Sequence, residues 1–256
     1  MQEGRTIVSP SILCTGNTKL FRYGFKHVVI PSDIFHAHPE IWPFSAPFAG
    51  YHAGAARPLP LPLFIQSESE PEPQEGKHLK IDAIFVYNDP RDMGLDTQLV
   101  IDLLLSHRGF LGTRSKNNGQ KNLPSHGYAS DSQPPLYFAN PDIFWAGQYP
   151  LPRLGSGAFR ASIQGLWREI TGGSDLGSNL ITGGKPSSWT YRFADARLSE
   201  QWSHLHANPS AGDRLERMYV ATLPRLFTSH RRFLSDLKLF NDHTLTTATD
   251  IWLVIT

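Results

Sequence analysis

Two polar segments follow strand-like runs in the sequence, and their residue types suit the binding of an anionic small molecule. Asn140–Asp142 (Asn-Pro-Asp) follows the apolar run 136–139, and Gly184–Pro186 (Gly-Lys-Pro) follows a second strand-like run and precedes a helix. Amide and carboxylate groups can hydrogen-bond a ligand, and a lysine can offset phosphoryl charge. Proteins of the α/β class usually place binding groups at the ends of their strands. Both segments are therefore candidate binding turns, although Asn-Pro-Asp also favours a turn without function.

The strands that must position these turns are predicted from short apolar runs. Such runs predict buried strands at residues 28–30, 81–87 and 136–139, another strand that begins at 218–220, and a short one at 251–255. Residues 1–18 are polar and irregular, and no element is predicted there.

The helices are predicted from apolar residues at helical spacing and from capping residues. One helix is expected over residues 96–106 with Asp96 as its N-cap, and another from near Gly157 to Gly172. Ser187 or Ser188 is predicted to cap a helix that runs to about residue 202, and a helix is also expected near 227–240. The apolar face of the helix that begins near Gly157 is predicted to comprise Phe159, Ile163, Leu166, Trp167 and Ile170.

Two segments are predicted to lack regular structure. Residues 51–80 are rich in proline and then in polar residues, which is typical of a linker. Residues 112–133 are polar and low in apolar content, which predicts a disordered insertion.

The composition limits the classes of protein to which the chain can belong. The chain has 256 residues, of which 40% are apolar and 18% charged, and this suits a folded domain with a substantial core. The net charge of +1 gives no global electrostatic reason to bind nucleic acid or an anionic membrane. The single cysteine, Cys14, excludes an intrachain disulfide. We expect no transmembrane segment and no signal peptide.

Several motifs in order resemble the haloacid dehalogenase (HAD) superfamily. They are Pro39–Phe44, Asp89–Asp96, Asn140–Asp142, the Pro152–Gly157 turn and Gly184–Pro186. The resemblance covers residues 23–220 and is to the type II-A capped phosphatases, in particular the branch that contains the cat eye syndrome critical region protein. It implies a partial Rossmann-like core with an inserted α/β cap of type C2. The implied division is a core piece at 1–50, a linker at 51–80, the cap at 81–178, a second core piece at 179–220 and an unmatched tail at 221–256. By this comparison the chain looks truncated at both ends. The core is then expected to have open sheet edges, through which the chain could self-associate.

The resemblance implies Mg²⁺-dependent hydrolysis of a phosphomonoester through an aspartyl-phosphate. Family members use an Asp-x-Asp nucleophile pair and a Gly-Asp-x-x-x-Asp metal motif, and neither occurs in this sequence. Asp92 and Asp96 have acidic spacing but are interpreted as a turn and a helix cap, so no metal ligand is assigned. The chain is therefore predicted to be inactive and to bind no Mg²⁺ tightly, whereas intact relatives use Mg²⁺. The alternative is a non-catalytic module that binds a phosphorylated small molecule or a protein partner.

The resemblance also assigns the site residues. Lys185 corresponds to the lysine that steadies the nucleophile and the transferring phosphate, and Gly184 belongs to the same motif. Asn140 and Asp142 correspond to the cap loop that faces the substrate. The expected partner is a phosphorylated small molecule, and the expected location is mitochondrial by resemblance and otherwise cytoplasmic.

Overall fold

The structure is a computed structural model, and it describes residues 11–15, 27–66, 71–205, 217–221 and 250–254 of the chain. The chain forms two compact units, residues 1–185 and 186–256. The candidate binding turns both lie in the first unit.

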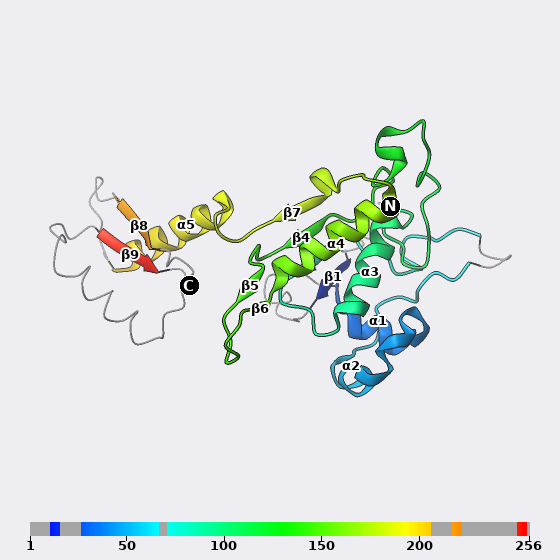
Figure 1. Cartoon of the computed structure of the whole chain (residues 1–256), viewed down its shortest axis with the longest axis horizontal. Coiled ribbons are helices and arrows are strands. Elements are labelled where there is room, and N and C mark those ends of the chain that lie inside the picture. Colours follow the sequence, from blue (N-terminus) through cyan, green and yellow to red (C-terminus); the bar gives the residue numbers. More distant parts are fainter. Residues whose placement is uncertain (1–10, 16–26, 67–70, 206–216, 222–249, 255–256) are drawn as a thin grey trace, which may run out of the picture. The chain divides into compact units, whose positions relative to one another are not determined.

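A five-stranded parallel sheet forms the centre of the first unit (Figure 1). Its strands, in spatial order, are β2 (His27–Val29), β1 (Ser11–Thr15), β3 (Ala83–Val86), β4 (Leu136–Phe138) and β7 (Leu180–Thr182). All four neighbouring pairs are parallel. Parallel strands joined through helices define a mixed α/β fold, and this strand order is consistent with a Rossmann-like fold.

Helices connect the strands and cover one face of the sheet. They are α1 (Pro31–Ala37), α2 (Ala49–Ala55), α3 (Met93–Leu105) and α4 (Ser156–Thr171), with the short 3₁₀ turns η2 (Pro39–Ile41), η3 (Pro43–Phe48), η4 (Pro124–Gly127) and η5 (Gly177–Asn179). A two-stranded hairpin, β5 (Phe144–Trp145) and β6 (Arg153–Leu154), is inserted between β4 and α4.

The main hydrophobic core lies between this helical layer and the sheet. Alternate residues of β3 point to opposite faces, so Ile84 and Val86 join the core while Phe85 lies on the other face. There the Phe85 ring stacks on Tyr137 of β4 at a centroid distance of 4.7 Å. Full burial of a side chain such as Ile84 stabilises the fold by about 1.5–3 kcal/mol, so the α3 and α4 contacts hold the sheet.

Helix α4 agrees with the sequence prediction except in the width of its apolar face. It begins at Ser156 and ends at Gly172, whose φ of +69° is the left-handed conformation that glycine favours at a helix end. Phe159, Ile163 and Trp167 are buried, whereas Leu166 and Ile170 are about two-fifths exposed. The buried face is thus narrower than the predicted one, because α4 packs on the sheet along a single stripe.

The predicted cap of α3 is wrong. The helix begins one turn earlier than predicted, at Met93, and its N-cap is Asp92, whose side chain accepts a hydrogen bond from the Leu95 amide at 3.1 Å. Asp96 instead lies buried in the first turn. Both residues are acidic, and the sequence pattern alone does not distinguish which aspartate precedes the first helical turn.

Two further expectations are wrong. The segment 1–18 contains β1, which pairs with both β2 and β3 and is therefore an inner strand of the sheet. Residues 112–133 are an ordered loop instead of a disordered insertion. The Asn118 side chain donates to the Leu105 carbonyl at 2.7 Å, and Tyr128 packs edge-on against Trp167 at 5.9 Å. Contacts of this kind compensate for the low apolar content of the loop.

The sheet also bears on the expected division into core and cap. Strand β2 lies in the predicted core piece, β3 and β4 in the predicted cap and β7 in the second core piece, yet all belong to one sheet. In the predicted linker, Phe64 and Leu79 are buried against the unit. The division into a HAD core and cap remains a prediction, and its proposed boundaries do not separate the strands of this sheet.

The second unit contains α5 (Ser188–Leu205) and the parallel pair β8 (Arg217–Ala221) and β9 (Asp250–Val254). The Ser187 hydroxyl accepts a hydrogen bond from the Trp189 amide, which confirms Ser187 as the cap of α5. Both strands occur where the sequence predicts them, and the helix predicted near 227–240 lies outside the described residues. Among the helices of the described residues, none has the length and apolarity needed to cross a membrane.

Candidate functional site

Three turns leave the same edge of the sheet. Val86, Phe138 and Thr182 are the last residues of β3, β4 and β7, and they are aligned in the register of the sheet. The ladder continues one step beyond the strands, because the Gly183 amide donates to the Phe138 carbonyl at 2.7 Å. The turns that follow β4 and β7 contain the two segments that the sequence singles out.

The turns after β4 and β7 touch each other. Gly184 has a φ of +81°, and a Cβ at this position would lie 2.5 Å from Cδ of Pro141 and 3.0 Å from the Ala139 carbonyl oxygen. Only glycine meets both demands, the left-handed backbone and the close approach. Asn140, Asp142, Gly184 and Lys185 are therefore brought together in one pair of turns.

The turn after β4 is organised by its own side chain. The Asn140 Oδ1 atom accepts a hydrogen bond from the Asp142 amide at 2.8 Å, which is the pattern of an Asx turn. The Asn140 amide nitrogen remains as a donor on an exposed residue. Lys185 is half-buried at the start of the next segment. This pair of turns presents an amide, a carboxylate and an ammonium group on adjacent backbone segments.

The beginning of α4 is covered by the turn after β4. The Gly157 amide donates to the Asp142 carbonyl at 2.9 Å, and a Cβ on Gly157 would lie 2.2 Å from the Pro141 carbonyl oxygen. The Ser156 hydroxyl donates to the Asp89 carboxylate at 2.8 Å and so links α4 to the turn after β3. Gly155 and Gly157 thus permit close packing of the backbone, and the group that approaches this helix end is the protein's own carbonyl.

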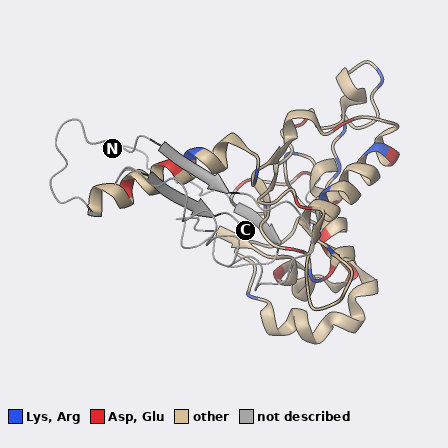
Figure 2. Cartoon of the chain, turned by 60° about the vertical axis from the view of Figure 1, so that its left-hand side comes forward, with Lys and Arg blue, Asp and Glu red and all other residues tan. Residues whose placement is uncertain are grey.

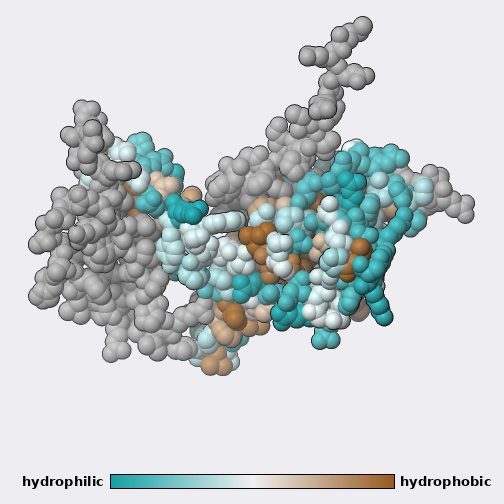
Figure 3. All heavy atoms as spheres, turned by 90° about the horizontal axis from the view of Figure 1, so that it is seen from above, coloured by the Kyte–Doolittle hydropathy of each residue, from teal (hydrophilic) through white to brown (hydrophobic). Residues whose placement is uncertain are grey.

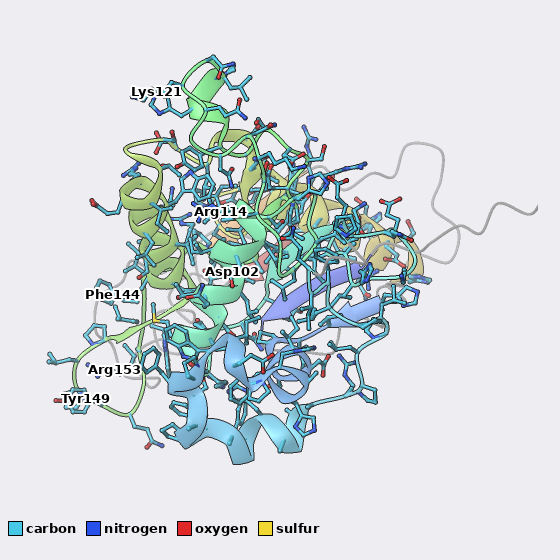
Figure 4. The ribbon with its side chains drawn as sticks, turned by 90° about the vertical axis from the view of Figure 1, so that its right-hand side faces the viewer. Asp102, Arg114, Lys121, Phe144, Tyr149 and Arg153 are labelled. Carbon is cyan, nitrogen blue, oxygen red and sulfur yellow. The ribbon has the colours of Figure 1, made fainter. Side chains whose placement is uncertain are left out.

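The hairpin β5–β6 continues from Asp142 and carries exposed apolar side chains. Phe144, Trp145 and Tyr149 are each about half exposed, and the Arg153 guanidinium lies over the Tyr149 ring at 4.4 Å. Figure 4 shows Phe144, Tyr149 and Arg153 on this hairpin, directed away from the sheet. Apolar residues also occupy separate areas of the face shown in Figure 3. A surface of this kind, next to polar turns, suits contact with a ligand or with another protein surface.

A second polar cluster is buried among the helices, and the sequence analysis missed it. His52 Nδ1 lies 2.9 Å from the Ser32 hydroxyl, and His52 Nε2 lies 3.3 Å from the Asp92 carboxylate, which also accepts from the Ser45 hydroxyl. Burial raises the pKa of Asp92, but hydrogen bonds from Ser45, the Leu95 amide and His52 outweigh it and lower the pKa. The Ser–His–Asp order resembles a nucleophile triad, yet its three members are buried. We interpret it as a cluster that ties α1, α2 and α3 together.

Among the described residues, Arg91 forms no ion pair with Asp89 or Asp92. Asp92 is used by this buried cluster, and Asp89 accepts from Ser156 instead. Both carboxylates are therefore held by groups from distant segments.

The residues at the sheet edge do not fit a magnesium site. Mg²⁺ prefers several oxygen ligands, usually including carboxylates. In the part of the chain that the structure describes, no three His, Cys, Asp or Glu side chains are close enough to hold a metal ion. We therefore assign no metal-dependent chemical step to these residues.

Basic and acidic residues are interspersed over the described helices and loops in the view of Figure 2.

Comparisons with known proteins relate the chain to hydrolases. No protein-family model matches it. It is 33% identical over 174 residues to the cardiolipin synthase (CMP-forming) / mitochondrial hydrolase fusion protein of Schizosaccharomyces pombe, covering 68% of this chain and 24% of that protein. It is 29% identical over 213 residues to a mitochondrial hydrolase of Saccharomyces cerevisiae, covering 83% of this chain and 53% of that protein. The chain thus spans about half of one relative and about a quarter of the other, and both names contain a mitochondrial hydrolase.

Proposed function

We propose that this chain supplies the phosphate-binding turns of a HAD-like phosphatase of type II-A, acting on a small phosphomonoester. Two observations support the proposal. The turns that carry Asn140, Asp142 and Lys185 are packed together through Gly184 at the end of a parallel sheet. The relatives are named as hydrolases. The contact of Gly184 with Pro141 carries the argument, because it brings together residues that are 43 positions apart in the sequence.

Each polar group has a distinct role in the proposed site. The Lys185 ammonium offsets the charge of a phosphoryl group, and the Asn140 amide donates to an oxygen of the substrate. Asp142 accepts from hydroxyl groups of the alcohol portion, which gives it a part in selectivity. With no Asp-x-Asp pair in the sequence, we propose that the chain by itself binds a phosphomonoester without hydrolysing it.

Titration of the purified chain with glycerol phosphate, followed by NMR, tests this proposal. Lys185→Ala is expected to weaken binding at least about tenfold, because a hydrogen bond to a charged group contributes about 1.5–3 kcal/mol. Lys121→Ala is the matched control, since Lys121 lies on the 112–133 loop, away from the hairpin in Figures 1 and 4. Equal affinity of the two variants would contradict the assignment of Lys185. Mg²⁺-dependent turnover that Lys185→Ala abolishes would contradict binding without hydrolysis.

The exposed hairpin favours a second candidate function, which is non-catalytic binding of a protein partner. Phe144, Trp145 and Tyr149 form an aromatic surface, and aromatic residues are enriched at protein interfaces. Under this alternative, Trp145→Ser abolishes partner capture and leaves glycerol phosphate binding intact. We also propose a mitochondrial location, which rests on the names of the two relatives.

A further inference from the structure

A polar pocket lies between α4 and β7, apart from the turns described above. Its volume is about 420 Å³. Arg160, Gln164 and Arg168 line it from α4, where their spacing of four residues places them on one face of the helix. Thr182 at the end of β7 and Asp175 in the loop after α4 complete the polar lining. Figure 1 shows α4 and β7 as neighbouring elements of the first unit.

The two arginines of this pocket are in different electrostatic situations. The Arg168 guanidinium is neutralised by Asp175, since both Nε and Nη2 lie 2.9 Å from the same carboxylate oxygen. Arg160 forms no ion pair with any carboxylate of the described residues. The pocket therefore carries the uncompensated positive charge of Arg160.

The hydrogen-bonding capacity of Arg160 is also largely unused. Its Nη1 atom reaches the Thr182 hydroxyl at 3.4 Å, which is long for a hydrogen bond. Its Nε atom is buried and has no hydrogen-bond partner within the described part of the chain. A buried donor without a partner costs about 1–3 kcal/mol. The Nη atoms of Arg160 are outside this set of buried, unpartnered atoms, so they are the donors that a ligand in the pocket reaches.

We propose that this pocket binds the oxyanion of a small polar molecule, either a phosphate or a carboxylate. The planar guanidinium of Arg160 presents its two Nη atoms as a fork that matches two oxygens of such a group. The Thr182 hydroxyl and the Gln164 amide supply further donors on the same side. The pocket uses none of the residues Asn140, Asp142 and Lys185, so this proposal does not rest on the proposed phosphatase function.

The pocket is coupled in the chain to the candidate binding turns. Thr182 is three residues before Lys185, and Arg160 is one helical turn after Ser156. An oxyanion bound by both Arg160 and Thr182 links the first turns of α4 to the end of β7. Occupation of the pocket therefore stabilises the first unit and fixes the strand that leads to Lys185.

NMR titrations of the purified chain with inorganic phosphate and with succinate test the proposal. Saturable shifts are expected at Gly177 and Thr182. Arg160→Gln is expected to weaken binding at least about tenfold, as for the loss of one charge-assisted contact, while Arg160→Lys retains the charge, loses the fork and gives an intermediate affinity. Arg114→Gln is the matched control, since Arg114 is exposed and does not line the pocket.

The outcomes separate this site from the proposed phosphatase site. Saturation by phosphate alone or by succinate alone supports the pocket and identifies its ligand class. Unchanged affinity in folded Arg160→Gln protein overturns the proposal, and so do shifts that map to the Lys185 turn and disappear in Lys185→Ala. Loss of glycerol phosphate binding in Lys185→Ala, with phosphate still bound at Gly177 and Thr182, supports two separate sites.

Discussion

Asp96 makes the stability of the first unit dependent on pH. Its side chain is buried in the first turn of α3, next to the N-cap Asp92. Burial, together with the charge of Asp92, raises the pKa of Asp96 from 3.8 to about 8. Ionisation of Asp96 is thus much harder in the folded chain than in the unfolded chain. Its contribution to stability is fully present below pH 3.8 and is lost as the pH rises through about 8.

The size of this effect follows from the pKa shift. The folded and unfolded values differ by about four units, and each unit corresponds to about 1.4 kcal/mol. The largest loss is therefore about 6 kcal/mol, reached above pH 8, and the loss at pH 7 is about 4 kcal/mol. These are upper bounds, since local rearrangement around an ionised Asp96 reduces them. A loss of this size is comparable with the whole stability of many domains.

Asp96→Asn removes the ionisable group and keeps nearly the same shape. Urea unfolding, followed by tryptophan fluorescence between pH 4 and pH 8, measures the effect. The variant is expected to match the wild type at pH 4 and to be more stable by about 3–5 kcal/mol at pH 8. Asp195→Asn, at an exposed position, is the control and is expected to change neither value. Parallel pH profiles of Asp96→Asn and the wild type would refute the reasoning.

Two other substitutions test the packing of the first unit. Gly157→Ala places a methyl group against the Pro141 carbonyl and is expected to destabilise the chain by more than about 2 kcal/mol. Gly165→Ala, in the same helix, places its methyl group in open space and is expected to stabilise the chain by about 0.5–1 kcal/mol. Thermal unfolding of both variants measures the difference, and equal midpoints would argue against the close contact. His52→Ala removes a hydrogen-bond donor from the buried Asp92 carboxylate and is expected to lower the free energy of unfolding in urea by about 2–4 kcal/mol. The control, His36→Ala at an exposed position, is expected to lower it by less than about 0.5 kcal/mol. Similar losses for the two variants would show that the cluster does not stabilise the fold.

Much of the sheet could be predicted from local sequence. Strands β3 and β4 are continuous apolar runs, because one face of each strand packs into the core and the other carries the stacked rings of Phe85 and Tyr137. Helix α4 was predictable from its periodic apolar residues and from Gly172 at its end. The positions of the two candidate binding turns were also predictable, since polar residues follow strands at Asn140 and Lys185. Each of these elements can be predicted from residues that lie close together in the sequence.

The features that the sequence did not reveal depend on distant partners. Strand β1 (Ser11–Thr15) mixes polar and apolar residues, and its place inside the sheet comes from pairing with β2 and β3. His52 and Asp92 are 40 residues apart, so nothing local indicates that they meet. Arg160 and Gln164 look like an ordinary solvent-facing side of a helix. Only the packing of α4 beside β7 turns that side into a pocket.

The contact between Gly157 and the turn at residues 140–142 restricts how this protein can change. The backbone of the turn hydrogen-bonds the first turn of α4, so an insertion or deletion there displaces the helix as well. Exchange of the side chain at position 142 leaves those backbone contacts in place, whereas exchange of Asn140 removes the hydrogen bond that its Oδ1 atom accepts from the Asp142 amide. Residues 146–152, at the tip of the hairpin, lie beyond the constraint and tolerate changes in length. The turn is therefore open to point substitution at position 142, and the hairpin is open to changes in loop length at its tip.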